Sequence, residues 1–341
     1  MKIKLVLLFF PLLFLGSVCN NMDQEEVVPE PVSLSGRDYA FVSDNLILLA
    51  NDNKEAVRAT DPQKVSRLPS FLPSGQEIIY IEEEDGFRKF NRLNLKTRQV
   101  DFIYATKGEP TFYIVSPNGK FLLYLENETL YLLDINNKET EKIAEHVNSP
   151  AWSEDSKSFI YVGEEGALFL REFNINQELQ DEKEIIKEDV GTPKFIGLDM
   201  IVFERCKDEK CNLVIYDLFK QEKNRDLKEY KDTQNPNPDI LVSPDKKMLI
   251  LTRQDEVTAL PIAEIIEISS GKTLVKYEDA RYPVWNKESN NIFYEKQDLD
   301  LNNDLGKNIY LGDLHGQDSV FMEKAEQFQA LGNNFSNTIS Q

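Results

Sequence analysis

The sequence predicts an all-β protein, a β-propeller built from four-stranded blades. The first observation is internal repetition, because stretches of the form SPAWSEDSKSFIYVG recur down the chain. Their turn positions lie about 37 to 47 residues apart, the span of one propeller blade. The second observation is that each copy sets apolar, β-branched runs on both sides of a short polar turn, as paired antiparallel strands do. The aligned turn positions are Pro73, Pro117, Glu154, Gly197, Pro244 and Lys287.

Each unit combines a tight turn with strands that become more polar along the chain. A turn such as Pro117-Asn118-Gly119 forms readily, because proline presets φ and Asn or Gly tolerates the conformation that follows. The strand after the turn is apolar on both faces, a third strand follows, and a fourth is more polar. A blade shows this gradient because only its middle strands lie between neighbouring blades. Third strands are predicted at 130–135, 168–173, 213–218, 264–268 and 309–314.

The number of units favours seven blades. Six units begin near residues 65, 109, 147, 190, 234 and 280. A partial unit at 38–60 precedes them and lacks its first strand. We predict that the isolated apolar segment from Phe328 to Phe335 pairs beside residues 38–60 and closes the ring by terminal strand exchange, which removes open sheet edges. Six blades with an N-terminal extension is the alternative.

The stretch SPAWSEDSKSFIYV resembles the TolB-type, WD-repeat-like propeller repeat, which runs Ser-Pro-x-Trp-Ser-Pro-Asp-Gly followed by apolar residues. Trp152 and Trp285 stand at its tryptophan position. Asp155 and Asp245 stand at its aspartate position, and the resemblance covers about residues 38–335. It implies a propeller but little about activity, because the family uses this scaffold in binding proteins and in peptidase accessory domains. Aliphatic residues replace the tryptophan in weaker copies: Leu72, Val115 and Val242.

Residues 1–19 are predicted to be a secretory signal. Lys2 and Lys4 precede an apolar stretch from Leu5 to Leu15, which is too short to span a membrane. The sequence LGSVC, ending at Cys19, is similar to a bacterial lipoprotein cleavage site. The chain is therefore expected to be exported and anchored by a lipid on Cys19 in the bacterial cell envelope, in the periplasm or at the outer surface. Ordinary signal cleavage nearby is the alternative.

The rest of the chain divides into a tether and one domain. Residues 20–35 carry four acidic residues, two prolines and no aromatic residue, so they predict an acidic flexible tether. Residues 36–341 are predicted to form a single propeller domain, because every blade packs on its neighbours.

The three cysteines are consistent with export. Cys206 and Cys211 bracket four residues between two predicted strands, so a hairpin would place them opposite each other within reach of a disulfide. An oxidising compartment favours that bond and leaves Cys19 free for a lipid. Metal binding by the pair is the alternative, but no histidine or other cysteine stands at a zinc spacing.

The net charge of −20 limits the partners. Such a field repels nucleic acid and anionic membrane surfaces, so no nucleic-acid function is expected. Acidic clusters such as Glu82-Glu83-Glu84-Asp85 predict solvated loops. The functional interpretation of these clusters is a docking surface for another envelope protein with a basic surface.

The segment from Asp298 to Gly306 carries a side-chain oxygen at every second position between two predicted strands. Calcium prefers six to eight hard oxygen ligands, and loops with this spacing wrap the ion. The segment predicts a calcium site with these side-chain ligands: Asp298, Asp300, Asn302 and Asp304. The match is partial, because Asn303 stands where calcium loops have glycine, and a solvated acidic loop is the alternative. Nothing else in the sequence requires a cofactor.

Catalytic motifs are absent from the sequence. It has no G-x-S-x-G elbow, H-E-x-x-H motif, P-loop or Rossmann glycine pattern. Its two histidines, His146 and His315, fall at loop positions. We therefore predict a non-enzymatic envelope protein whose propeller serves as a platform for binding protein or ligand. A glycan or small-ligand binder, or an enzyme with its site in the central channel, is the alternative.

Replacing Cys19 with alanine tests the lipid anchor. The Cys19→Ala protein should leave the membrane fraction and become soluble, because one thiol carries the acyl chains. Fractionation with N-terminal sequencing measures this. An anchored Cys19→Ala protein, or a mature N-terminus elsewhere, would refute the lipoprotein prediction.

Overall fold

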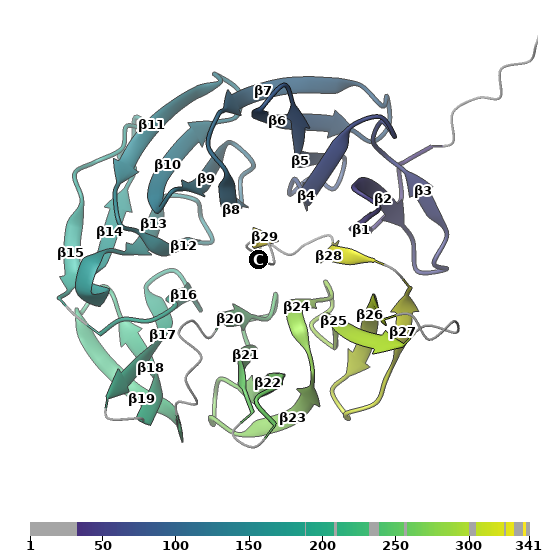
Figure 1. Ribbon diagram of the computed structural model, residues 1–341. Helices are drawn as coiled ribbons and strands as arrows, with labels where there is room; N and C mark the ends of the chain where they lie inside the picture. Colours follow the sequence, from purple (N-terminus) through teal and green to yellow (C-terminus); the bar gives the residue numbers. More distant parts are fainter. Residues whose placement is uncertain are drawn as a thin grey trace, which may run out of the picture. The chain divides into compact units, whose positions relative to one another are not determined.

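A computed structural model describes residues 33–341 apart from 188, 208–209, 232–238, 256–257, 300–304, 324, 331–336 and 339–341. The chain divides into two units, 1–32 and Ser33–Gln341, and only the second is described below. It is an all-β propeller of seven blades built on four antiparallel strands each, as predicted, and blade 3 carries a further strand, β29 (Asn337–Thr338) (Figure 1). None of the helices in the described ranges is long and apolar enough to cross a membrane. The predicted signal, Cys19 and most of the tether lie outside the described residues.

Six blades follow chain order from the innermost strand outward. Blade 2 contains β4 (Val65–Phe71), β5 (Glu77–Glu84), β6 (Phe87–Asn94) and β7 (Val100–Thr106). Blade 3 contains β8 (Pro110–Val115), β9 (Phe121–Glu126), β10 (Thr129–Asp134) and β11 (Glu139–Ala144). Blade 4 contains β12 (Asn148–Trp152), β13 (Ser158–Val162), the 3₁₀ turn η1 (Glu164–Gly166), β14 (Leu168–Glu172) and β15 (Lys183–Ile186). Blade 5 contains β16 (Lys194–Phe195), β17 (Met200–Lys207), β18 (Lys210–Asp217) and β19 (Glu222–Lys231). Blade 6 contains β20 (Asp239–Val242), β21 (Met248–Gln254), β22 (Pro261–Glu267) and β23 (Thr273–Glu278). Blade 7 contains β24 (Arg281–Trp285), β25 (Asn291–Leu299), β26 (Leu305–Asp313) and β27 (Asp318–Met322).

Blade 1 is assembled from both ends of the unit. Its strands are β28 (Glu326–Ala330), β1 (Tyr39–Ser43), β2 (Leu46–Ala50) and β3 (Ala56–Arg58). Residue Ala330 stands opposite Tyr39, and Gln329 stands opposite Ala40. The first residues of the C-terminal segment thus pair where the sequence predicts. Because residues 331–336 lie outside the described residues, closure by the whole segment stays a prediction.

Gln327 connects β28 to both neighbouring blades. Its backbone N–H donates to Oε1 of Glu295 in blade 7 at 2.7 Å. Its side-chain Oε1 accepts the backbone N–H of Leu68 in blade 2 at 2.8 Å. The residue has a φ of 52°, a left-handed conformation that costs free energy in a residue with a side chain. The two hydrogen bonds offset that cost and fix β28 between blades 7 and 2.

The turn between the first two strands of a blade repeats one backbone conformation. Its last residue has a positive φ in five blades: Gly75, Gly119, Ser156, Lys246 and Ser289. Where serine takes this place, its hydroxyl also joins two blades. Ser156 Oγ accepts the N–H of Asn118 at 2.9 Å, and Ser289 Oγ accepts the N–H of Asp245 at 3.0 Å. The repeated turn therefore serves blade packing as well as chain reversal.

The hydrophobic core of the described residues is divided into clusters between adjacent blades. Each of the seven clusters combines apolar residues from two neighbouring blades. The cluster between blades 7 and 1 includes Phe41, Phe293 and Phe321, and the ring of Tyr39 lies 5.1 Å from that of Phe293. This division explains why the middle strands are apolar on both faces. It also makes each blade depend on its neighbours.

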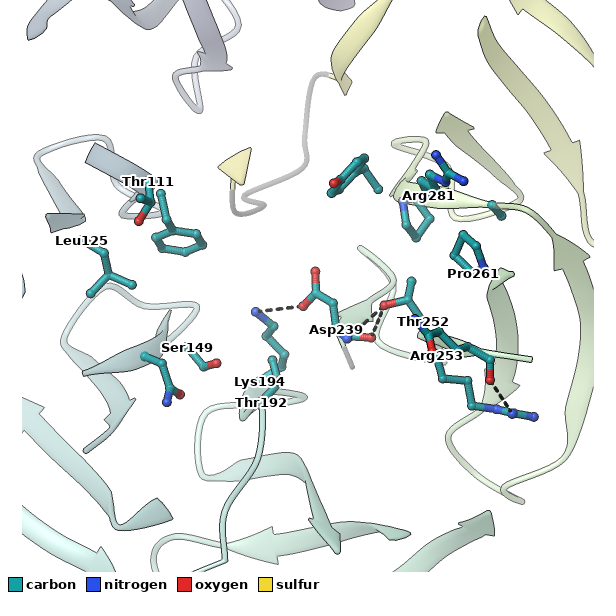
Figure 2. A pocket seen from close by; sticks show the side chains of 16 residues that line it. Thr111, Leu125, Ser149, Thr192, Lys194, Asp239, Thr252, Arg253, Pro261 and Arg281 are labelled. Carbon is teal, nitrogen blue, oxygen red and sulfur yellow. Dashed lines mark hydrogen bonds and ion pairs between the residues drawn. The ribbon is translucent and has the colours of Figure 1, made fainter. Parts of the chain in front are cut away.

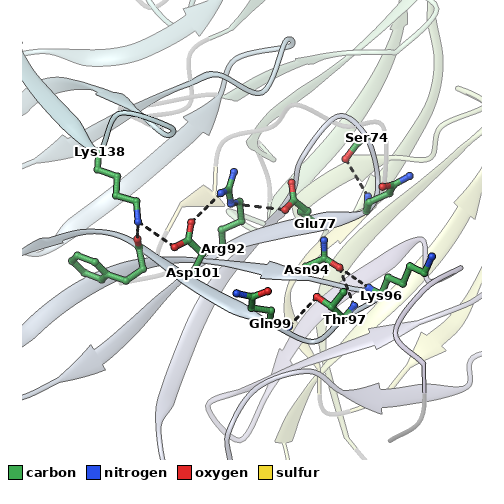
Figure 3. A network of polar contacts seen from close by, with 11 residues as sticks. Ser74, Glu77, Arg92, Asn94, Lys96, Thr97, Gln99, Asp101 and Lys138 are labelled. Atoms are coloured by element: carbon green, nitrogen blue, oxygen red, sulfur yellow. Dashed lines mark hydrogen bonds and ion pairs between the residues drawn. The ribbon is translucent and has the colours of Figure 1, made fainter.

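Ion pairs extend the packing of blade 2 against blade 3 at the outer strands (Figure 3). Arg92 lies between Glu77 and Asp101, and its Nη2 donates to Asp101 Oδ2 at 2.9 Å. Lys138 of blade 3 donates to the other Asp101 oxygen at 3.1 Å. The hydrogen bonds from Lys138 and Arg92 hold the pKa of Asp101 below its ordinary value, against the opposing effect of desolvation. These groups are partly exposed, so their contribution to stability is small.

A buried carboxylate joins blade 5 to blade 6. The side chain of Glu264 in β22 is 1% exposed, and its Oε1 accepts a hydrogen bond from Lys228 Nζ of β19 at 2.6 Å. The hydroxyl of Thr273 donates to the same oxygen, and Arg253 Nε lies 3.5 Å from Oε2. Burial opposes ionisation of Glu264, but Lys228 and Thr273 outweigh it and hold the pKa of this carboxyl below its ordinary value.

Glu264→Gln should therefore destabilise the protein by about 1–3 kcal/mol near neutral pH. The pKa of Glu264 is lower in the folded than in the unfolded state, so its contribution is complete above the unfolded value of about 4.3 and is lost as the pH falls through the folded value. Urea unfolding at several pH values should show a difference from the parent that shrinks below about pH 4. The exposed Glu278→Gln is the matched control and should change little. A difference that is constant across pH would contradict the role of charge.

Candidate functional site

A cavity of about 700 Å³ lies at the mouth of the central channel, where the innermost strands begin (Figure 2). Its walls come from five consecutive blades, blades 3 to 7. Pockets of this size accommodate small ligands or short chain segments. Because each blade contributes only a few residues, the shape of the cavity depends on how the blades pack.

Two charged side chains from adjacent blades lie side by side at the cavity wall and form an ion pair (Figure 2). Lys194 begins β16 of blade 5, and Asp239 begins β20 of blade 6. Lys194 Nζ lies 3.7 Å from Asp239 Oδ1, and the two side chains are 15% and 38% exposed. The backbone N–H of Asp239 donates to the hydroxyl of Thr252 at 2.9 Å, which fixes the start of β20. The pair is polar but carries no net charge.

The two arginines of the lining are bound elsewhere. Arg253 donates to the backbone oxygen of Gln254, faces Glu264 and stacks over the ring of Tyr230. The Nη2 atom of Arg281 lies 3.1 Å from Asp279 Oδ1. Neither guanidinium is left as a free positive charge for an anionic ligand.

The remaining lining mixes neutral polar groups with apolar ones. Ser149, Thr111 and Asn148 provide hydroxyl and amide groups. Phe112, which is 8% exposed, and Leu125 provide apolar surface. Hydroxyl and amide groups orient a ligand through hydrogen bonds, and the apolar side chains contribute contact area. The lining suits a ligand that alternates polar and apolar groups without a net charge.

The sequence analysis missed these lining residues, although the repeat contains a signal for them. Counting back five positions from each aligned turn residue gives, in blades 3 to 7, five residues that line the cavity: Phe112, Ser149, Thr192, Asp239 and Tyr282. Six positions back gives Thr111, Asn148 and Arg281 in three of these blades. The repeat register therefore identifies positions that approach the channel mouth. Only the ring geometry shows that they meet.

The predicted cysteine pair is not among the residues that line this cavity. Cys206 of β17 stands directly opposite Cys211 of β18, with Cα atoms 4.0 Å apart, and the structure holds them as a disulfide. The pairing of Lys207 with Lys210 makes the hairpin loop shorter than the four residues predicted. Glu204 lies close enough to form a potential metal-ligand group with the two sulfurs, but sulfurs joined in a disulfide cannot act as thiolate ligands.

The predicted calcium loop is also shorter than expected. Asp298 lies in β25 opposite Gly306, so its placement in a loop was wrong. The alternation of Asp and Leu that was interpreted as ligand spacing is equally a strand pattern, and pairing continues to Leu299 and Leu305. Asp300, Asn302 and Asp304 lie outside the described residues, so the calcium site stays a prediction.

The histidines do not contribute to the cavity wall either. His146 is 62% exposed between β11 and β12, with Nδ1 3.6 Å from Glu128. His315 lies in the turn between β26 and β27, where its N–H donates to Asp313 Oδ1 at 2.8 Å. Both occupy loop positions, as the sequence predicts.

Comparison with known proteins establishes the fold class. No protein-family model and no curated protein matches the sequence. An oligogalacturonate lyase in complex with manganese aligns with a TM-score of 0.60 and 12% identity, over 83% of this chain and 83% of that chain. An oligogalacturonate lyase from Vibrio parahaemolyticus aligns with a TM-score of 0.58 and 14% identity, over 84% and 85%. A TolB-type protein from Agrobacterium tumefaciens aligns with a TM-score of 0.50 and 16% identity, over 69% and 88%.

These similarities define a seven-bladed propeller that is structurally similar to oligogalacturonate lyase and to TolB. At these identities they show the fold alone. The function has to be argued from the cavity.

Calcium binding can be tested by thermal unfolding. If the segment from Asp298 to Gly306 binds calcium, a concentration ten times the Kd should stabilise the protein by about 1.4 kcal/mol and raise its Tm. Asp300→Ala should abolish the gain, whereas Asp85→Ala, in an exposed turn of blade 2, should retain it. An equal gain with magnesium, or with Asp300→Ala, would indicate an acidic segment without a specific site.

Proposed function

We propose that this protein is a non-catalytic, exported binding propeller that holds a segment of another polypeptide in the cavity at the channel mouth. The observation that carries the proposal is the lining: hydroxyl, amide and apolar groups around the Lys194–Asp239 ion pair, with two arginines that pair with acids outside the lining. A polypeptide offers the same alternation of backbone polar groups and apolar side chains. Lys194 and Asp239 already neutralise each other, so the cavity favours a segment without net charge.

The negative charge of the chain favours a partner with a basic surface. With a net charge of −20, the chain attracts cationic proteins over several ångströms and raises their rate of encounter. The lipid on Cys19 would hold the propeller at the bacterial envelope, and the acidic tether would let it reach a partner there. The function requires no cofactor. Calcium at the segment from Asp298 to Gly306 would serve stability.

A second candidate is an enzyme or binder for acidic glycans, favoured by the similarity to oligogalacturonate lyases and by Lys194 at the cavity. The described lining fits manganese poorly, because it offers one carboxylate, that of Asp239, and no histidine. A mutually neutralised pair also differs from the separately tuned acid and base that elimination or hydrolysis needs. Incubation with oligogalacturonate, with and without manganese, tests this candidate. Release of unsaturated sugar would establish it and refute the non-catalytic proposal.

A cavity-filling variant tests the binding proposal. Thr111→Trp introduces a bulky side chain at the cavity wall, so capture of the partner by crosslinking in envelope fractions should fall about tenfold or more. The control is Thr97→Trp, in the exposed turn between β6 and β7, away from the residues that line the cavity. This variant should capture the partner normally. Mass spectrometry identifies and quantifies the captured protein. Equal capture by both variants would contradict a site at the channel mouth.

A further inference from the structure

Blade 3 carries a fifth strand that lies in the middle of the ring. The strand β29 (Asn337–Thr338) pairs antiparallel with β8, so that Asn337 stands opposite Tyr113 and Thr338 opposite Phe112 (Figure 1). Among the described residues, no other blade has a strand on the channel side of its innermost strand. The inner edge of β8 is therefore a place where an extended chain already adds to a blade.

This edge is continuous with the cavity. Thr111 and Phe112 belong to β8 and line the cavity wall. A strand edge presents backbone N–H and C=O groups that an added chain can pair with, whatever its sequence. A segment bound along β8 would thus combine backbone pairing with the side-chain contacts of the cavity.

The composition of the C-terminal tail fits this location. Residues 327–341 include no charged side chain, although 29% of the whole chain is charged. A charged segment in the cavity would lose hydration, and the charged side chains of the described lining already pair with other groups, Lys194 with Asp239 and Arg281 with Asp279. Both the tail and the lining therefore point to an uncharged, extended polypeptide as the ligand.

We propose that the inner edge of β8 is a strand-addition site for an uncharged, extended segment of a partner protein, and that β29 occupies this edge until the partner displaces it. The proposal deepens the proposed function, on which it rests, by naming the chemistry of the bound segment and its competitor. The described pairing of β29 involves only two residues, so little backbone pairing has to be broken. As an intramolecular competitor, the tail lowers the affinity for an external peptide without preventing exchange.

The test measures binding of a fluorescein-labelled peptide with the sequence of residues 331–341 to two full-length variants by fluorescence anisotropy. Asn337→Pro/Thr338→Pro removes the N–H groups and fixes φ, so β29 cannot pair. Asn337→Ala/Thr338→Ala keeps the backbone donors and serves as the matched control. The proline variant should bind the peptide about tenfold or more tightly than the alanine variant, because its edge is free. A peptide with the same two prolines should not bind.

Hydrogen exchange of β8 provides a second measurement. The amides of β8 that point toward β29 should exchange faster in the proline variant and regain protection when the unsubstituted peptide is added, whereas those that donate to β9 should not change. Both variants should keep the Tm of the parent, because β29 lies outside the four-stranded core of its blade. A Tm lowered by several degrees in the proline variant would make β29 a structural strand and overturn the proposal.

Two results of the peptide-binding measurement would also overturn the strand-addition proposal. Equal affinity of the peptide for both variants would show that the tail does not compete, while polypeptide binding at the cavity would stand. Failure to bind the proline variant would show that the β8 edge does not accept this segment. The proposed function would then still be judged by partner capture with Thr111→Trp.

Discussion

The rest of the structure depends on one kind of contact between blades. In it, an aromatic side chain of one blade donates a hydrogen bond to the innermost strand of the preceding blade. Trp152 Nε1 donates to the backbone oxygen of Ile114 at 3.3 Å, and Trp285 Nε1 donates to that of Leu241 at 3.0 Å. Both indoles are almost fully buried, so each bond satisfies two polar groups while the ring fills the core between blades. In blade 3 the hydroxyl of Tyr113 reaches the backbone oxygen of Leu68 in β4, the innermost strand of blade 2, and also that of Ile79 in β5 at 2.9 Å. These bonds fix neighbouring innermost strands against each other, and the cavity is formed by those strands.

The sequence predicts the fold well because the same local physics repeats in every unit. Turn residues, apolar middle strands and tryptophan positions recur at blade spacing, so weak copies are recognised beside strong ones. The last three residues of the missing strand β28, Phe328–Ala330, were also predicted to pair there, because an apolar segment after the last blade has few other uses. The strand ends were less predictable: Asp298 continues β25 because its Asp/Leu alternation satisfies a strand as well as a ligand loop.

The candidate site could not be predicted in the same way. Lys194 and Asp239 are separated by a whole blade in the sequence. Only the packing of blades 5 and 6 in the ring brings Lys194 Nζ to 3.7 Å from Asp239 Oδ1. The pairing of β29 with β8 leaves no periodic pattern, because two residues are too few to show one. The fold is shared by proteins with different activities, so it does not choose between binding and catalysis. Our proposal of binding therefore rests on the lining, with its paired charges and its neutral polar groups.

The central claim, that the channel mouth holds a partner polypeptide, is tested most directly by site-specific photocrosslinking. A photoreactive residue replaces Ser149 at the cavity or, in a separate protein, the exposed Phe219 in the turn between β18 and β19. Envelope fractions are irradiated, and the crosslinked peptides are identified by mass spectrometry. The account predicts one partner segment, without charged residues, crosslinked from position 149 and not from position 219. Crosslinks that form only from position 219, or a non-protein ligand at position 149, would contradict it.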